Sequence, residues 1–431
     1  MAKPGDKVKV VTKDESIEGV LMPNEETDSV VVKLSSGYNV GIEKSKVEKI
    51  EVVEKNKEKV VKKGEVKFNK NLPTISILHT GGTIASKVDY KTGGVVARFE
   101  PEELLDMFPE LRGISNIKSR LVSKMFSEDM RFAHYGLMIK AIKEEIESGV
   151  DGIILTHGTD TMTYTSAALA FALENLPIPV IMVGAQRSSD RGSSDAAVNL
   201  ICAADFIAKT DFSGVAICMH ENIDDNICVV LPACKTRKLH ASRRDAFKAV
   251  NDTIIARVNF EEKKIEFVKK DYTKRDKKRE LVVKDGFEEK VGILRCHPNM
   301  VPKQFEFFKG YNGLVIEGTG LGQAPTGVPN ELCEIHKKNL AAIKNLVKEG
   351  TIVVMTSQTI FGRVQMHVYS NAIDLVNVGV ISGEDMLTET VFIKLVWLLG
   401  NYKDKEEIKR LVKTNLRGEI NPRIEPDEYL E

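Results

Sequence analysis

Two short segments of the sequence carry hydroxyl side chains and glycines directly after an apolar run. The first reads ILHTGGTIAS at residues 77–86, and the second reads IILTHGTDTM at residues 153–162. Glycine lets backbone amides approach a bound molecule closely. A threonine hydroxyl is a weak nucleophile that needs a neighbouring base before it can attack. The two segments are therefore candidate parts of one ligand site.

Open parallel sheets bind ligands beyond the carboxyl ends of their strands, where both segments are predicted to lie. The residues that would supply hydroxyls, backbone amides or a carboxylate at these strand ends are Thr80, Gly81, Gly82, Thr83, Thr156, Gly158, Thr159 and Asp160. Neither segment has GxGxxG spacing and no GxxxxGK[ST] occurs in the chain, so nucleotide binding by this chain is not supported. Taken singly, either segment is equally typical of a strand-end turn with capping threonines.

The elements that must position these residues follow an α/β pattern from Leu72 onward. β-Branched strand-length runs alternate with helix-like stretches, which is the signature of a parallel sheet. The strands are expected at 74–80, 152–158, 178–185 and 214–220, and helices at 133–149 and 163–176. A charged interruption at 261–290 precedes a second α/β unit. Its strands are expected at 291–296, 312–318 and 351–357, and its helices at 330–350 and 388–400.

The first 54 residues have a different periodicity. Five short runs with alternating apolar residues predict a small all-β barrel of the SH3 or Sm type, with a hairpin turn at Ser36–Gly37. The predicted organisation is a barrel domain at 1–54, a charged linker at 55–71, and two α/β domains at 72–285 and 286–431.

Composition limits the functional classes. The chain has 431 residues with 62 basic and 62 acidic side chains, so a whole-surface polyanion binder is not expected. None of the six cysteines forms a CxxC pair or a zinc-finger spacing, which favours buried free thiols and no metal site. No apolar stretch of about 18 residues is present and the N-terminal segment does not read as a signal peptide, so a cytoplasmic protein is expected.

The two segments resemble the signature motifs of the bacterial-type L-asparaginase family, TGGTIAS and THGTDTM. The resemblance covers about residues 72–403 and continues through SEDM at 127–130, VGAQRSSDRGSSDAAVNL at 183–200 and KLHASRRDAFKAVN at 238–251. It also includes TSQTIFGRVQMHVYSNA at 356–372. The resemblance implies two asparaginase-like α/β domains. It also implies a homodimer or higher oligomer whose active site lies near an intersubunit face.

The family's roles carry over onto matching positions of this sequence. The resemblance implies that Thr83 attacks the substrate's side-chain amide, and that Thr159, Asp160 and Lys238 form a second catalytic group. Substrate-binding positions are implied at Tyr90, Ser127, Gly82 and Gly158. Lys248 is the alternative to Lys238. Lys238 is preferred because its spacing to the DAF block at 245–247 fits the family pattern better.

The chemistry requires these residue types. A lysine can act as a base when burial lowers its pKa, while an adjacent aspartate opposes that shift and can orient the amine. Glycine-flanked backbone amides can hold the oxyanion of the tetrahedral intermediate. The segment KTRKLHASRRDAFK at 235–248 is strongly basic, with Asp245 its only acid. It is interpreted either as a rim that attracts acidic ligands or as an ordinary exposed hairpin.

The asparaginase resemblance leaves the N-terminal barrel unexplained. The complete arrangement resembles the D-subunit family of archaeal glutamyl-tRNA(Gln) amidotransferases. This implies a chain that releases ammonia from glutamine or asparagine. A partner, the amidotransferase E-subunit, would bind glutamyl-tRNA(Gln), ATP and magnesium in a heterotetramer, and this chain would hold no cofactor. Two alternatives stay open: a stand-alone cytoplasmic asparaginase or glutaminase, and an RNA-binding protein with an inactive asparaginase-like body.

Overall fold

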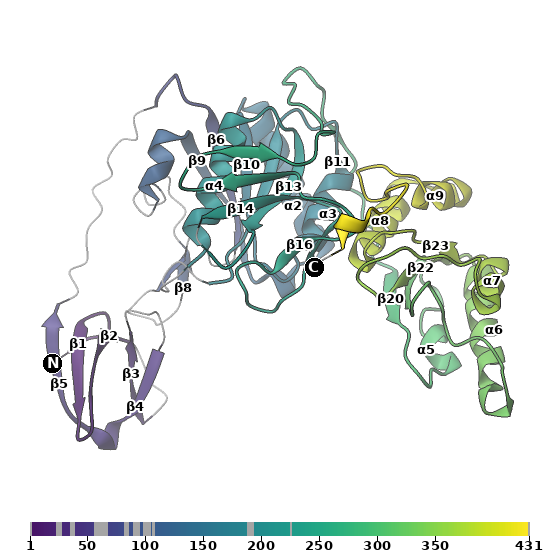
Figure 1. The fold of residues 1–431 in the computed structure, drawn as a ribbon, viewed down its shortest axis with the longest axis horizontal. Coiled ribbons are helices and arrows are strands. Elements are labelled where there is room, and N and C mark those ends of the chain that lie inside the picture. The colour runs from purple at the N-terminus through teal and green to yellow at the C-terminus, as the bar shows by residue number, and fades with distance from the viewer. Residues whose placement is uncertain are drawn as a thin grey trace.

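The computed structural model describes most of the chain (Figure 1). The described residues are 2–22, 28–34, 39–55, 68–81, 86–88, 95–97, 105, 108–187, 194–224 and 226–429. The predicted turn at Ser36–Gly37 lies outside these ranges, as do three predicted site residues, Gly82, Thr83 and Tyr90. The described site is therefore built from the second threonine segment and its neighbours.

The N-terminal unit is the predicted five-stranded all-β domain. Its strands are β1 (Lys7–Thr12), β2 (Ser16–Leu21), β3 (Ser29–Lys33), β4 (Asn39–Glu43) and β5 (Val47–Glu54), with the 3-10 turn η1 (Lys44–Lys46). They form an antiparallel sheet in the order β4-β3-β2-β1-β5 around a core of Val8, Val10, Val32 and Ile42. Within the described residues β4 and β5 are not paired, so hydrogen bonds do not close the predicted barrel there.

The central sheet has eight strands in the order β18-β17-β14-β13-β12-β10-β6-β9. Their bounds are β6 (Thr74–Gly81), β9 (Asn116–Met125), β10 (Gly152–Thr156), β12 (Pro179–Val183), β13 (Gly214–His220), β14 (Ile227–Pro232), β17 (Ala256–Asn259) and β18 (Ile265–Phe267). Strands β9, β6, β10, β12 and β13 are parallel, and this arrangement was predicted for β6, β10, β12 and β13. The antiparallel extension through β14, β17 and β18 was not predicted, nor was β9.

Helices bury both faces of this sheet. Successive residues of β10 alternate between two cores: Ile153 and Leu155 pack with α2 (Phe132–Glu147) and α3 (Met162–Ala172), while Ile154 packs with α4 (Ala196–Lys209). A strand that is covered on both sides must be apolar at every position, which is why these runs were recognisable in the sequence.

The C-terminal unit has a second, four-stranded parallel sheet. Its strands are β20 (Val291–Arg295), β21 (Gly313–Gly318), β22 (Ile352–Ser357) and β23 (Ile381–Ser382). Its helices are α5 (Pro302–Glu306), α6 (Ile335–Lys348), α7 (Ser370–Asn377), α8 (Thr388–Asn401) and α9 (Lys405–Val412). Helix α8 lies against α3 (Figure 1), where Phe171 and Trp397 stack with ring centroids 5.5 Å apart. The two α/β units therefore share a continuous core.

Short elements complete the described structure. Three two-stranded pairs are β7 (Ser86–Val88) with β8 (Val95–Ala97), β11 (Leu173–Glu174) with β19 (Val282–Val283), and β15 (Thr236–Lys238) with β16 (Phe247–Ala249). The remaining 3-10 turns are η2 (Pro109–Gly113), η3 (Ser127–Asp129), η4 (Glu331–Cys333) and η5 (Pro426–Glu428). Among the helices of the described ranges, none has the length and hydrophobicity to cross a membrane.

Candidate active site

The two threonine segments meet at one edge of the central sheet. Strands β6 and β10 are parallel neighbours, with His79 paired to Thr156 at their carboxyl ends. The Thr80 hydroxyl donates to the Thr156 carbonyl at 2.9 Å, which joins the segments directly. The sequence prediction that both segments lie at strand ends is therefore confirmed as far as Gly81.

Gly81 must be glycine at the end of β6. Its φ is +122°, and a Cβ atom placed there would lie 2.0 Å from the Met125 carbonyl oxygen. The register between β6 and β9 also shifts at this point. A side chain at position 81 would therefore collide with the backbone of β9.

A buried histidine shapes the turn after β10. Burial lowers the pKa of His157 to about 4, so its ring is neutral near pH 7. The Gly158 carbonyl, 2.7 Å from Nδ1, can only accept, which assigns the proton to Nδ1. Nε2 then accepts from the Thr165 hydroxyl at 2.9 Å. His157 thus fixes the backbone that presents Thr159 and Asp160.

Ser127 lies against this turn. A Cβ atom on Gly158 would be 2.7 Å from Ser127 Cβ, and the Thr161 hydroxyl donates to the Ser127 carbonyl at 2.7 Å. Ser127 is buried, but its hydroxyl has no hydrogen-bond partner among the described residues. The Ser127 hydroxyl beside Gly158 is therefore available for a ligand.

Lys238 reaches both polar side chains of the turn. Its Nζ donates to Thr159 Oγ1 at 2.9 Å and to Asp160 Oδ1 at 2.7 Å. The Lys238 side chain is 13% exposed, whereas that of Asp160 is 64% exposed. Among the described residues Asp160 Oδ2 has no partner. The cluster therefore combines a shielded amine with a carboxylate that faces solvent.

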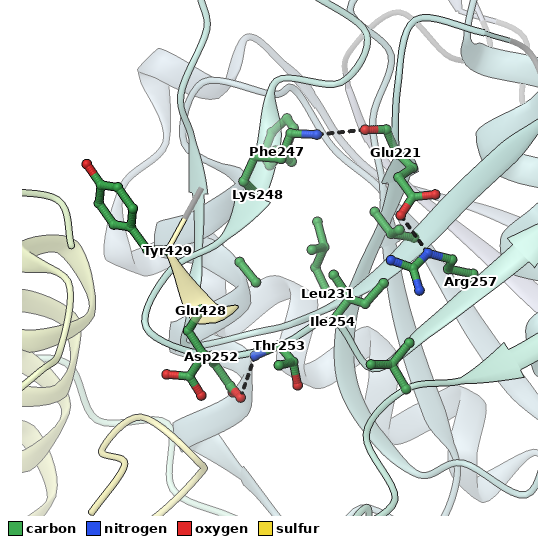
Figure 2. A pocket seen from close by; sticks show the side chains of 13 residues that line it. Glu221, Leu231, Phe247, Lys248, Asp252, Thr253, Ile254, Arg257, Glu428 and Tyr429 are labelled. Carbon is green, nitrogen blue, oxygen red and sulfur yellow. Dashed lines mark hydrogen bonds and ion pairs between the residues drawn. The ribbon is translucent and has the colours of Figure 1, made fainter. Parts of the chain in front are cut away.

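The alternative lysine lies elsewhere. Lys248 Nζ donates to the Glu221 carbonyl at 2.6 Å and is 4.0 Å from Asp245. It lines a separate cavity of about 330 Å³ together with Arg257 and Tyr429 (Figure 2). Lys238 is therefore the lysine of this segment that contacts Thr159 and Asp160.

The expected basic rim at 235–248 is only partly a surface. Lys235 is completely buried and forms an ion pair with Asp385, so it cannot attract a ligand from solvent. A run of basic residues is usually exposed, but Lys235 is buried because the tertiary fold places the buried Asp385 carboxylate beside it. Arg243 is exposed and engaged by Asp245 in two hydrogen bonds.

Sequence reasoning missed the support beneath Thr159. A Cβ atom on Gly184 would be 2.8 Å from Thr159 Cγ2, so the segment after β12 forms the floor of the site. Buried Asp195 accepts from the backbone amide of Arg187, and Asn199 donates to the Gly184 carbonyl at 3.0 Å. The spacing of four residues between Asp195, the N-cap of α4, and Asn199 was the signal available in the sequence.

The described site thus brings together Thr159, Asp160, Lys238, Ser127 and Gly158. Thr83, Tyr90 and Gly82 lie outside the described residues. In the same described ranges no cluster of three or more His, Cys, Asp or Glu side chains could hold a metal ion. The geometry provides a hydroxyl, an amine and a carboxylate in one hydrogen-bonded group, which is suited to proton transfer at a carbonyl substrate.

Comparison with known families covers almost the whole chain. Residues 74–273 match the asparaginase N-terminal family, residues 290–412 the glutaminase/asparaginase C-terminal domain, and residues 2–53 the GatD N-terminal domain. Among solved structures, the thermostable L-asparaginase of Thermococcus kodakarensis has a TM-score of 0.71 and 28% identity, covering 81% of this chain and 100% of its own. L-asparaginase I of Vibrio cholerae has a TM-score of 0.70 and 29% identity, covering 81% of this chain and 99% of its own.

Full-length relatives include the N-terminal unit. The glutamyl-tRNA(Gln) amidotransferase D-subunit of Pyrococcus furiosus is 45% identical over 99% of this chain and 97% of its own length. The corresponding D-subunit of Methanococcus maripaludis is 44% identical over 97% and 98%. The chain therefore belongs to the D-subunit family of glutamyl-tRNA(Gln) amidotransferases.

Proposed function

We propose that this chain is the amide-donor subunit of a tRNA-dependent amidotransferase. It releases ammonia from glutamine or asparagine, and a partner protein uses that ammonia to convert Glu-tRNA(Gln) to Gln-tRNA(Gln). One observation carries the proposal. The match to the D-subunit of Pyrococcus furiosus extends over 99% of this chain, whereas the L-asparaginase structures match only 81% of it although nearly all of their own length is included. The N-terminal unit is the part that a free asparaginase lacks.

The proposed hydrolysis proceeds through an acyl-enzyme. The Thr83 oxygen bonds to the side-chain carbonyl carbon of the substrate, and its proton passes to a base. The carbon–nitrogen bond then breaks, and ammonia leaves with a returned proton. Water hydrolyses the resulting ester and releases the acidic amino acid. Thr83 enters this scheme through the family resemblance, since it lies outside the described residues.

The described residues support the proton-handling and binding parts of this scheme. The 2.9 Å contact between Lys238 Nζ and Thr159 Oγ1 places the lysine amine within direct reach of a hydroxyl for proton transfer. The exposed Asp160 carboxylate, with Oδ2 unpartnered among the described residues, can pair with the substrate's α-ammonium. The Ser127 hydroxyl can donate to the substrate's α-carboxylate.

The proposed partner supplies the ATP-dependent step, for which this sequence has no recognisable motif. The sequence has no phosphate-binding loop, so ATP and magnesium are assigned to a partner, the amidotransferase E-subunit, which also holds glutamyl-tRNA(Gln). Its equal numbers of acidic and basic residues are consistent with tRNA binding chiefly by that partner. Two copies of each protein would form a cytoplasmic heterotetramer around a homodimer of this chain.

The experiment compares glutamine hydrolysis in three settings: this chain alone, this chain with the E-subunit and ATP, and the same mixture with Glu-tRNA(Gln). We expect the last mixture to hydrolyse glutamine fastest and to form Gln-tRNA(Gln). Equal rates in all three, with no Gln-tRNA(Gln), would instead identify a stand-alone asparaginase or glutaminase.

A further inference from the structure

The segment that precedes Lys238 is held by the C-terminal α/β unit. The Thr390 hydroxyl, in the first turn of α8, donates to the Cys234 carbonyl at 2.8 Å. Arg237 lies 3.5 Å from the buried carboxylate of Glu389, in the same turn. Contacts from one turn of α8 therefore act on both sides of Lys235.

Lys235 itself contacts Asp385, which precedes α8. Its Nζ donates to Asp385 Oδ2 at 2.5 Å and to the Asp385 carbonyl at 3.1 Å, and both side chains are completely buried. The Asp385 carboxylate also accepts from the Asn421 amide at 3.2 Å. Burial lowers the pKa of Lys235, while the carboxylate opposes that shift. Buried ion pairs are poor sources of net stability, so this pair calls for another reason.

The second strand of the hairpin is tied to the same point. The Val250 amide, just after β16, donates to the Lys235 carbonyl at 2.7 Å. Asn251 Nδ2 then donates to the Asp385 carbonyl at 2.9 Å and to the Gly362 carbonyl at 3.1 Å. Both strands that carry the Lys238 hairpin are thus anchored on residue 385 of the other unit.

We infer that the Lys235–Asp385 pair is a positioning device for the catalytic lysine. Three residues of extended strand span about 10 Å, so the root of the hairpin decides where Lys238 Nζ lies relative to Thr159 and Asp160. Lys235 itself touches no reacting atom. The inference rests on the proposed function of Lys238 and assigns the C-terminal unit a part in catalysis through its hold on the hairpin.

The first test replaces both charges by apolar side chains of similar size, Lys235→Met with Asp385→Leu. Removing both charges avoids leaving one of them buried and unpaired. We expect kcat for glutamine hydrolysis to fall by roughly 10- to 100-fold with KM nearly unchanged, because the substrate-binding groups stay in place. A folded variant with wild-type kcat would overturn the inference.

The chain offers a matched control. Lys394 and Glu419 form another completely buried pair, 2.6 Å apart, and Lys394 Nζ also donates to the Val412 and Thr414 carbonyls. None of these contacts involves the hairpin. Lys394→Met with Glu419→Leu should therefore disturb the fold comparably and leave kcat within about threefold of wild type. Equal kcat losses in both double variants would contradict the inference, because they would show that the Lys235–Asp385 pair affects catalysis only through general packing.

A mutant cycle with Lys238→Met separates positioning from general packing. If the pair acts through Lys238, its removal should change kcat little in a Lys238→Met background, so the two effects are not additive. Fully additive effects would contradict the inference. A Lys238→Met variant with normal kcat would refute the proposed role of Lys238 itself, and would thereby be recognised as a separate failure.

A milder variant keeps the test valid if the double variant does not fold. Thr390→Val preserves shape and removes only the hydrogen bond to the Cys234 carbonyl. We expect a kcat loss of roughly 3- to 10-fold with an unchanged KM and a slightly lower melting temperature, because the buried Cys234 carbonyl loses its donor. Wild-type kcat in Thr390→Val, measured alongside an unfolded double variant, would count against the inference.

Discussion

Replacing Lys238 by methionine should separate catalysis from stability. The substitution keeps the apolar stem and removes the Nζ contacts to Thr159 Oγ1 at 2.9 Å and to Asp160 Oδ1 at 2.7 Å. Loss of a positioned base typically costs about 10²- to 10⁴-fold in rate, and we expect kcat for glutamine hydrolysis to fall by that factor.

The structure predicts a small effect on folding. The Asp160 side chain is 64% exposed, so its charge stays solvated when the lysine is gone. Solvent-exposed ion pairs contribute about 0–1 kcal/mol to the free energy of unfolding. A loss of that size shifts the melting temperature by less than about 4 °C in a protein of this class.

The assay measures ammonia release under saturating glutamine, with thermal melting of the same preparation. Lys248→Met is the matched control, because that lysine contacts the Glu221 carbonyl and lines the separate cavity. Its kcat should stay within about threefold of wild type. The reasoning is refuted if Lys238→Met keeps near-normal kcat while Lys248→Met is inactive.

Three further predictions concern other parts of the molecule. Gly158→Ala should raise KM for glutamine several-fold more than it lowers kcat, because the new Cβ would displace Ser127; equal kcat and KM effects in steady-state assays would contradict this. Because burial lowers the pKa of His157 from 6.5 to about 4, the unfolded state binds the extra proton as the pH falls through this range, and about 3 kcal/mol of stability is lost between pH 6.5 and 4. His157→Gln should make the melting temperature fall less steeply between pH 6.5 and 4, and the same pH dependence in variant and wild type would contradict this prediction. A chain that begins at Phe68 keeps the hydrogen bonds between Asn69 and Asn116 and should fold and hydrolyse glutamine without coupling to the E-subunit; aggregation in size-exclusion chromatography would show that the body needs the N-terminal unit.

Much of the scaffold was predictable because its signals are local. Strands such as β10 are covered on both faces, so every residue from Ile153 to Leu155 is apolar and the run stands out in the sequence. The rule that parallel strands share a carboxyl edge then predicts that Thr80 and Thr156 meet. The antiparallel strands β14, β17 and β18 were not predicted. Strands β17 and β18 are only four and three residues long, and β14 lies outside the alternation of strands and helices on which the prediction relied.

The supporting residues were harder to predict because their partners are distant in the chain. The contact between Lys238 and Thr159 joins positions 79 apart and was expected only through the family resemblance. Lys235 stands among basic residues and was assigned to a surface, yet its partner Asp385 lies 150 positions away. Pairing of buried polar groups depends on how the two units pack, which no short stretch of sequence specifies.

The most direct test of the proposed function follows the nitrogen atom. Glutamine labelled with ¹⁵N in its side-chain amide is given to the reconstituted complex with ATP and Glu-tRNA(Gln), and the label in the glutamine esterified to tRNA is measured. The account predicts label transfer by the wild-type chain, loss of transfer in Lys238→Met, and recovery of unlabelled product in that variant when ammonium is supplied. Formation of Gln-tRNA(Gln) without label from glutamine, or label transfer unaffected by Lys238→Met, would contradict it.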